Sequence, residues 1–471
     1  MKMRMFKKSS IAGFVLLVLS ICCASQIASA EERWVGTWGS GQQDVNSASG
    51  NLPAAPGLAN NTLRQIVRAT VGGSRIRVQF SNKSTTTGGP ITINSAHIAL
   101  SNSGLPINSS IDTSTDTALT FNNGSASVTI PAGQEIYSDP VDFNVPPLSD
   151  LTVSIYFGSV SSTDVTSHPG SRTAYYIKTG NTVSDAEMQS GYKTEHWYIL
   201  SRVEVLRDDS YGCVVALGDS ITDGRGCDPN YDNRWPDKLA DKLHADANTI
   251  KVGVINQGIG ANAVLNDGLT GGSSALNRYD HDVIGQPGVR WVIVFEGIND
   301  ITSGKSATAL ESAYQTFINK AHANKILAYG ATITPYGSNN STRNTVNTWI
   351  MTPGNFDASL DFAAAVWNPA DHNFLNPAYR VYPPGSQNDG LHFNAAGFQA
   401  IVNGIDVNLF TLTADVDKDG VVNLVDFAIL AGQWLQAPGS PSADIAPMLA
   451  GNGDVNSKDL FIMTMQWLIE E

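Results

Sequence analysis

A serine at a strand-to-helix junction is the first candidate for chemistry in this chain. Ser220 lies in the run Gly-Asp-Ser-Ile-Thr-Asp-Gly at 218–224, which follows an apolar run at 213–217 and precedes a helix-like segment at 234–243. Open α/β sheets bind ligands at the carboxyl ends of their strands, and N–H groups at a helix start favour an anion. Ser220 is therefore a candidate nucleophile; a Gly/Asp/Ser turn without chemistry is the alternative.

Three further polar clusters lie at the ends of predicted strands or at the start of the last predicted helix. They occupy residues 256–262, 295–300 and 389–394. The first two follow apolar runs, and the third opens a helical stretch at 395–410. In a single α/β segment such clusters gather at one edge of the sheet, so we expect them to lie near Ser220.

In their order, these clusters resemble the four sequence blocks of the SGNH hydrolases, also called GDSL hydrolases. The blocks are a Ser block, a Gly block, a G-x-N-D block and a D-x-x-H block. This chain matches them with Ser220, the Gly258/Gly260 loop, Gly297-Ile298-Asn299-Asp300 and Asp389-Gly390-Leu391-His392. The resemblance implies a flavodoxin-like α/β catalytic domain with a parallel sheet.

The resemblance also implies ester hydrolysis through an acyl-enzyme. Ser220 would attack the carbonyl, with His392 as its base and then as the acid for the leaving alcohol. Asp389, three residues earlier, would orient the imidazole of His392. The oxyanion would meet the Ser220 N–H, the N–H of Ala261, where the family usually has Gly, and the Asn299 amide. No metal is expected for this chemistry.

Several other polar residues are expected to have structural roles. Asp219, Asp223 and Asp300 would fix the site loops by hydrogen bonds. His168 and His196 lie in the β-rich segment, far in sequence from the nucleophile. We therefore predict that both histidines are structural.

The N-terminus has the pattern of a signal peptide at 1–30. Four basic residues precede an apolar run at 11–21, and Ala-Ser-Ala follows as a cleavage site. An uncleaved anchor is the alternative, but the run is shorter than the ~20 residues that a span needs. Removing four positive charges changes the formal net charge from −14 to −18. We predict a secreted protein with no integral membrane span, and its acidic charge disfavours nucleic acid and anionic membranes as partners.

Residues 31–206 have the pattern of an all-β sandwich or jelly roll. Apolar and polar residues alternate at 74–80 and 151–157, and 91–93 and 126–130 are further strands. A subgroup of secreted SGNH enzymes carries such a domain, and the Trp-Val-Gly-Thr-Trp run here resembles its start. The domain could bind sugar or shape the substrate site, or it could be a structural support.

Residues 207–412 alternate predicted strands with helices, which favours a parallel sheet covered on both faces. Residues 326–333 and 356–362 are two more strand candidates. Cys213 begins the strand that ends near Ser220, and Cys227 lies just past the turn at the other end of that strand. A strand of seven residues at roughly 3.3 Å each keeps them too far apart for a disulfide. Two free thiols are expected.

Residues 413–471 contain an internal repeat of 33 residues, in which 426–435 matches 459–468. The first copy follows a loop with the EF-hand calcium pattern. Its candidate ligands are Asp415, Asp417, Asp419, Val421 and Asp426, with Gly420 at position 6. The paired loops resemble a dockerin, a small α-helical module of two EF-hand-like repeats. The resemblance implies structural Ca²⁺ and a cohesin-type protein partner.

The second loop departs from the calcium pattern. Its candidate ligands are Asp444, Asn452, Asn456 and Asp459. An insertion separates Asp444 from the rest, and Ala446 replaces an acid at position 3. Backbone carbonyls are the expected substitutes.

Together these patterns predict a secreted serine esterase that removes acyl groups, most simply acetyl, from a polysaccharide. A lipase or lysophospholipase is the alternative, although nothing in the chain resembles a long apolar lid. A non-catalytic binding protein is a third hypothesis, which the complete Ser/His/Asp set argues against.

Overall fold

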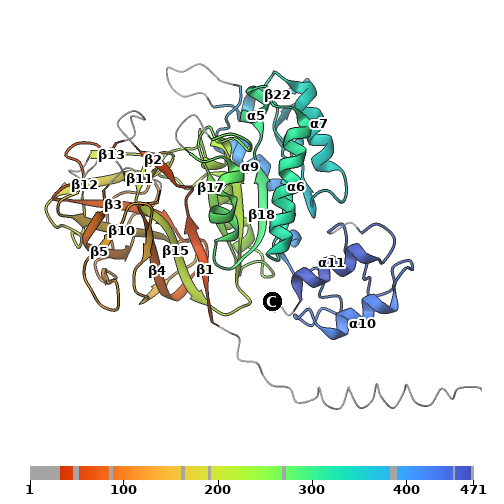
Figure 1. Cartoon of the computed structure of the whole chain (residues 1–471), viewed down its shortest axis with the longest axis horizontal. Coiled ribbons are helices and arrows are strands. Elements are labelled where there is room, and N and C mark those ends of the chain that lie inside the picture. Colours follow the sequence, from red (N-terminus) through yellow and green to blue (C-terminus); the bar gives the residue numbers. More distant parts are fainter. Residues whose placement is uncertain are drawn as a thin grey trace, which may run out of the picture.

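The structure, a computed structural model, describes residues 32–45, 52–83, 89–160, 165–188, 192–267, 272–381, 390–448 and 451–467. The predicted signal peptide and Asp389 lie outside the described residues. Figure 1 shows a β-rich part in red to yellow, an α/β part in green to cyan, and two helices in blue.

The first part is built from antiparallel sheets, as predicted. One sheet contains β1 (Arg33–Gly39), β15 (Leu200–Arg207), β4 (Gly73–Ser81), β8 (Glu135–Tyr137) and β9 (Val141–Val145). Another contains β13 (Tyr192–Thr194), β12 (Tyr175–Thr179), β3 (Asn61–Arg68), β10 (Asp150–Phe157), β5 (Ile91–Leu100), β6 (Thr117–Leu119) and β7 (Val128–Ile130). A small sheet joins β14 (Trp197–Tyr198), β11 (Val165–His168) and β2 (Gln43–Val45). Phe80 of the first sheet and Val153 of the second lie in one shared core.

The second part has the predicted parallel sheet, in the order β17-β16-β18-β19-β20. The strands are β16 (Gly212–Gly218), β17 (Val252–Gly258), β18 (Val289–Phe295), β19 (Leu327–Ala331) and β20 (Ala358–Leu360). In chain order this is 2-1-3-4-5, the flavodoxin-like arrangement, which opens a crevice where the winding reverses between β16 and β18. Ser220 follows β16 and Asn299 follows β18, so both residues lie at this crevice.

Helices cover both faces of the sheet because its strands are apolar on both sides. Val214 of β16 packs in one core with α3 (Trp235–His244) and α9 (Ala395–Asn403). Its neighbour Val215 packs in another core with α4 (Ala275–Tyr279), α6 (Ala307–Ala323) and α7 (Asn340–Met351). Successive strand residues point to opposite faces, so one apolar run supplies two cores.

Two predicted elements differ in extent from the structure. The strand predicted at 356–362 is only β20, because Asp361 accepts a hydrogen bond from the Ala364 N–H and starts the short helix α8 (Phe362–Val366). The helix predicted at 395–410 ends at Asn403, and a 3₁₀ turn follows at Val407–Phe410. Cys213 and Cys227 are both free, as predicted, and both are buried.

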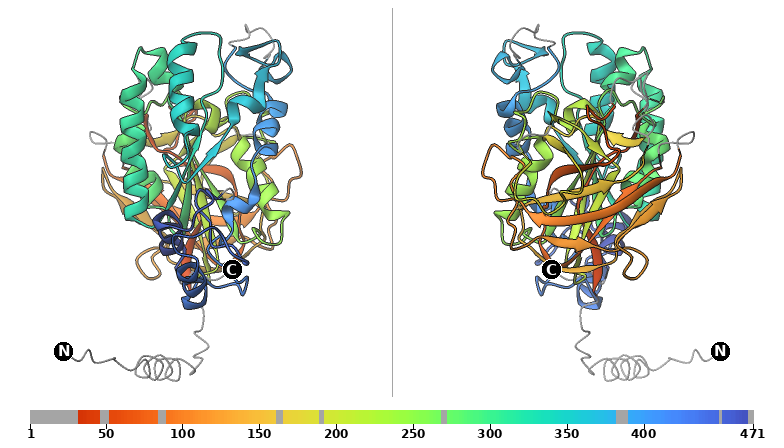
Figure 2. Two further views of the ribbon diagram at one scale, coloured as in Figure 1. Left: turned by 90° about the vertical axis from the view of Figure 1, so that its right-hand side faces the viewer. Right: turned by 90° about the vertical axis from the view of Figure 1, so that its left-hand side faces the viewer.

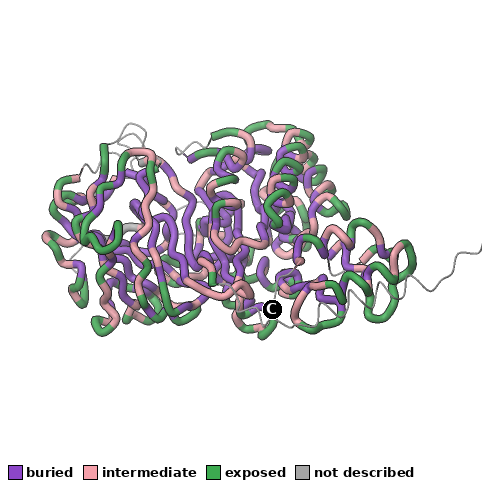
Figure 3. The backbone as a smooth tube through the Cα atoms, turned by 60° about the horizontal axis from the view of Figure 1, so that its bottom comes forward, coloured by how far each residue is buried: buried purple, intermediate pink, exposed green. Residues whose placement is uncertain are grey.

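Strand β1 of the β-rich part packs directly against β17, the edge strand of the parallel sheet (Figure 1). Buried backbone, drawn in purple, is concentrated in the middle of the molecule (Figure 3). Glycines make the approach of β1 to β17 possible. A Cβ on Gly39 would lie 2.9 Å from Ile255 Cγ2, and one on Gly41 would lie 2.5 Å from Ile259 Cγ1. The two parts therefore share a close interface.

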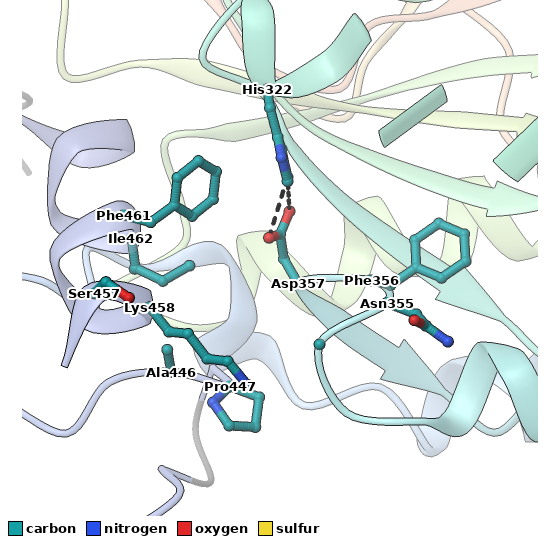
Figure 4. A pocket seen from close by; sticks show the side chains of 11 residues that line it. His322, Asn355, Phe356, Asp357, Ala446, Pro447, Ser457, Lys458, Phe461 and Ile462 are labelled. Atoms are coloured by element: carbon teal, nitrogen blue, oxygen red, sulfur yellow. Dashed lines mark hydrogen bonds and ion pairs between the residues drawn. The ribbon is translucent and has the colours of Figure 1, made fainter. Parts of the chain in front are cut away.

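The last part contains α10 (Leu424–Gly432) and α11 (Ser457–Gln466), below the lower end of α6 in Figures 1 and 2. Figure 4 shows Phe461 and Ile462 facing His322 and Asp357 across a pocket of about 220 Å³. The Tyr329 hydroxyl donates a hydrogen bond to the Leu409 carbonyl nearby. The helix α5 (Ile298–Thr302), which follows the carboxyl end of β18, lies at the opposite end (Figure 1). None of the described helices has the length and apolar character to span a membrane.

Candidate active site

Ser220 is the first residue of the short helix α2 (Ser220–Asp223), directly after β16. Asp219 caps this helix by accepting a hydrogen bond from the Ile221 N–H at 2.9 Å. Gly224, at φ 96°, ends the helix in the left-handed conformation that suits glycine. Ser220 is only 7% exposed, so the turn presents its hydroxyl at the floor of a pocket.

His392 supplies an imidazole to this serine. Its Nε2 lies 2.8 Å from Ser220 Oγ, although the two residues are 172 positions apart. His392 precedes α9, and its carbonyl accepts a hydrogen bond from the Val381 N–H. The pair has the geometry of a nucleophile and its base. Asp389 lies outside the described residues.

The loop after β17 brings Ala261 to the same pocket as Ser220. Ala261 has φ 59°, a conformation that favours glycine, and this is the position where the family usually has Gly. Asn299 follows Gly297, whose φ is 124°, and its Nδ2 donates to the Asn262 carbonyl at 2.7 Å. The amide group of Asn299 is therefore tied to the loop that carries Ala261.

The buried Arg278 is a residue that sequence reasoning missed. Its guanidinium donates to the carbonyls of Gly218 at 3.0 Å and Gln257 at 2.7 Å, and to Asn262 Oδ1 at 3.0 Å. It thereby joins the turn before Ser220 to the loop after β17. No local sequence signal distinguishes Arg278, which lies in the short helix α4.

Buried carboxyl groups lie beneath the site. Burial raises the pKa of Asp219 to about 7, and the charges of Asp300 and Asp223 act in the same direction. Burial also raises the pKa of Glu296 well above its usual range, against the charge of Arg278 at 3.6 Å. Asp300 accepts hydrogen bonds from the N–H groups of Val264 and Leu265, so it fixes the loop as expected.

Asp223 connects the site to the β-rich part. His168 Nε2 lies 2.8 Å from Asp223 Oδ1, and Arg172 Nη2 lies 2.6 Å from Asp223 Oδ2. Although burial raises the pKa of Asp223, the charge of Arg172 and the bond from His168 outweigh it, and the pKa lies below its usual value. His168, which was predicted to be structural, contacts the helix of Ser220 across the interface between the two parts.

Both ring nitrogens of His168 face acceptors. Nδ1 lies 2.8 Å from the Gly41 carbonyl, and Nε2 faces the Asp223 carboxylate. His168 therefore contacts the Gly41 carbonyl through one ring nitrogen and Asp223 through the other, and so links the two parts of the molecule. His196, the other histidine predicted to be structural, stacks on Tyr198 with 5.8 Å between ring centroids.

A pocket of about 280 Å³ opens over Ser220. The catalytic part contributes Ser220, Asp223, Arg225, Gly260 and Ala261, and the β-rich part contributes Gln43, Pro169, Gly170 and Arg172. A Cβ on Gly170 would lie 2.2 Å from the Asp223 carboxylate, which shows how closely this loop covers α2. The β-rich part therefore forms one wall of the site and is more than a distant support.

The candidate calcium loops have matching backbone geometry. In the first, Asp426 accepts from the N–H groups of Val416, Asp417 and Asn423; in the second, Asp459 accepts from those of Ile445, Ala446 and Asn456. Gly420 N–H donates to Asp415, and Gly453 N–H donates to Asp444. Oxygens of Asp415, Asp417 and Asp419 lie within 4.8 Å of one another. Hard oxygen donors of this kind suit Ca²⁺.

Comparisons with known proteins give one family match and several similar solved structures. Residues 216–400 match the model of the GDSL-like Lipase/Acylhydrolase family. Solved structures with similarity include an acetylxylan esterase from Geobacillus stearothermophilus (19% identity, TM-score 0.31, 41% of this chain and 91% of that chain). Another is an alpha/beta hydrolase from the metagenome of Lake Arreo, Spain (19% identity, TM-score 0.31, 41% of this chain and 92% of that chain). A third is a member of the lipolytic protein G-D-S-L family from Veillonella parvula (17% identity, TM-score 0.29, 41% of this chain and 94% of that chain). A comparison with curated proteins finds no match.

Proposed function

Since residues 216–400 form a GDSL-type acylhydrolase domain, we propose that the protein is a serine esterase that hydrolyses acetyl esters on a polysaccharide. The observation that carries this proposal is the 2.8 Å contact between Ser220 Oγ and His392 Nε2. In the reaction, Ser220 attacks the ester carbonyl while its proton moves to His392 Nε2. His392 then donates that proton to the leaving alcohol, and Asp389 is proposed to orient the ring.

The second half of the reaction reverses these roles. Water loses a proton to His392 and attacks the acyl-enzyme, and Ser220 recovers its proton as acetate leaves. In both halves the carbonyl oxygen becomes negative. We assign its stabilisation to the N–H groups of Ser220 and Ala261 and to the Asn299 amide. No metal or other cofactor takes part in these steps.

The character of the pocket favours a small acyl group on a polar alcohol. Its walls include Gln43, Arg172 and Arg225, and polar walls of this kind suit hydroxyl-rich sugars. A long fatty acyl chain needs an extended apolar channel. The lipase or lysophospholipase activity remains the alternative function.

A series of p-nitrophenyl esters with increasing chain length tests the proposal. The acetate ester should have the highest kcat/KM, and Ser220→Ala should lower kcat by on the order of 10⁴-fold or more. A Ser220→Ala protein with more than a tenth of wild-type turnover would contradict the assignment of the nucleophile. A maximum at octanoate or longer would favour the lipase alternative.

We further propose that the protein is secreted and that residues 413–471 form a dockerin-like module with two structural Ca²⁺ ions. The proposed ligands are those of the two predicted loops, and their matched backbone hydrogen bonds support the pairing. Leu424 (65% exposed), Val425 (51%) and Phe427 (40%) form an apolar surface at the start of α10. A cohesin-type protein is the proposed partner for this surface.

Calcium titration of the whole mature protein tests the module. Ca²⁺ should raise Tm, and Asp415→Asn with Asp417→Asn should remove most of that increase, because binding stabilises the state that binds. Mg²⁺ at the same concentration is the control. An unchanged Tm on adding Ca²⁺ would exclude the calcium proposal.

A further inference from the structure

The pocket over Ser220 differs in charge from the rest of the chain. Among the described residues that line it, the charged side chains are Arg172, Asp223 and Arg225. The whole sequence has a formal net charge of −14. The pocket beside Ser220 thus has more arginines than acids in its lining, although acids outnumber basic residues in the chain as a whole.

Two arginines and one carboxylate leave the lining of the pocket positive. The carboxylate of Asp223 already forms an ion pair with Arg172 at 2.6 Å and contacts His168. Its negative charge is therefore engaged in that ion pair. The buried acids beneath the site compensate little, because burial raises the pKa values of Asp219 and Glu296 and so favours their neutral forms.

Arg225 adds a further positive charge. It directly follows Gly224, which ends α2, and its N–H donates to the Ser220 carbonyl at 2.8 Å. Its backbone is therefore held against the turn of the nucleophile, while the residue as a whole is exposed. A guanidinium in this position is free to pair with an anionic group that enters together with the ester.

We propose that this pocket selects substrates that carry a carboxylate or sulfate on the sugar next to the acylated one, with Arg225 and Arg172 as the specificity-determining residues. This inference rests on the proposed esterase function and narrows its substrate to acidic polysaccharides. The β-rich part takes part in selection because it supplies Arg172.

Inhibition of p-nitrophenyl acetate turnover in the full mature chain separates the anion sources. Unacetylated oligogalacturonate, a sulfated galactan oligosaccharide and a neutral xylo-oligosaccharide of equal length are compared. Stronger inhibition by either acidic sugar than by the neutral one supports the proposal and identifies the anion; equal inhibition by all three, or by none, overturns it. The uninhibited turnover itself reports separately on the proposed esterase function.

Substitutions of Arg225 then test its role in substrate selection. Arg225→Gln should lower the ratio of kcat/KM on acetylated acidic oligosaccharides to that on acetylated neutral ones about five- to tenfold, mainly through KM. Arg225→Lys should restore part of the ratio, and added salt should lower it in the wild type. Arg75 lies on β4 and forms an exposed ion pair with Asp142. Arg75→Gln is the matched control and should leave the ratio unchanged. A ratio unaffected by Arg225→Gln overturns the assignment.

Discussion

Asp223 and His168 form a buried hydrogen bond of 2.8 Å that crosses from the acylhydrolase part to the β-rich part. Asp223 ends the helix that begins with Ser220, so this bond couples the position of the nucleophile to the second part. Arg172 adds an ion pair to the same carboxylate at 2.6 Å.

Asp223→Asn is expected to destabilise the protein by about 3 kcal/mol, because the partly buried Arg172 would lose its anionic partner and the buried His168 would lose a carboxylate contact. Urea unfolding measures the change, and p-nitrophenyl acetate turnover should fall with it. Asp142→Asn removes the exposed partner of Arg75 and should have no measurable effect. Equal effects of the two substitutions would contradict the structural role of Asp223.

Asn299→Ala is expected to lower kcat about 10²-fold with little change in KM, since the amide would stabilise charge that develops in the transition state. Steady-state kinetics on p-nitrophenyl acetate measure both constants. Asn319→Ala, on the exposed side of α6, is the control. A change confined to KM would mean that Asn299 only binds the substrate.

Ala261→Gly should preserve turnover of the acetate ester, because the backbone N–H is retained. Glycine adopts the φ of 59° without strain, and loss of the Cβ widens the pocket. The ratio of kcat/KM for the butyrate ester to that for the acetate ester should therefore rise. An unchanged ratio would show that Ala261 does not limit acyl size.

His281 lies between the two parts and should make the free energy of unfolding of the protein depend on pH. Burial alone would lower its pKa, but hydrogen bonds to Asp282 and to Glu135 of the β-rich part raise the pKa to about 9. Because the pKa of His281 is higher in the folded state than in the unfolded state, protonation of His281 stabilises the folded protein. This stabilisation is fully present below the unfolded-state pKa of about 6.5. It is lost as the pH rises towards the folded-state pKa of about 9. Tm measured from pH 6 to pH 10 should fall more steeply for the wild type than for His281→Gln. Parallel curves would rule out this contribution.

Chelation by EDTA should increase protease cleavage within 413–471 while ester turnover persists. The helices α10 and α11 lie at the end of the molecule opposite α5 (Figure 1). Since α5 follows β18 and Ser220 follows the parallel neighbour β16, Ser220 lies at the same edge of the sheet as α5. The core that they share with Tyr329 and Phe410 predicts an accompanying decrease in Tm. Loss of turnover on chelation would contradict the separation of the two sites.

Local patterns in the sequence determined much of the architecture. Alternation of apolar and polar residues predicts the antiparallel strands, and continuous apolar runs predict the parallel ones, because burial on one or two faces acts on neighbouring residues. The polar clusters after these strands predict that Ser220, Ala261 and Asn299 meet at one edge of the sheet. The acidic spacing at 415–426 likewise predicts the loop geometry before α10.

Contacts between the parts depended on the tertiary structure. His168 and Arg172 are 55 and 51 residues from Asp223, and no periodicity links such positions. Their approach depends on the packing of β1 against β17, where a Cβ on Gly39 or on Gly41 would be too close to the neighbouring side chains. The role of Arg278 could not be predicted for the same reason, because its acceptors Gly218, Gln257 and Asn262 lie 60, 21 and 16 residues away in the sequence. The sequence by itself thus determined the candidate nucleophile and the sheet that carries it, whereas the tertiary structure decided which charges surround Ser220, because long-range packing places them.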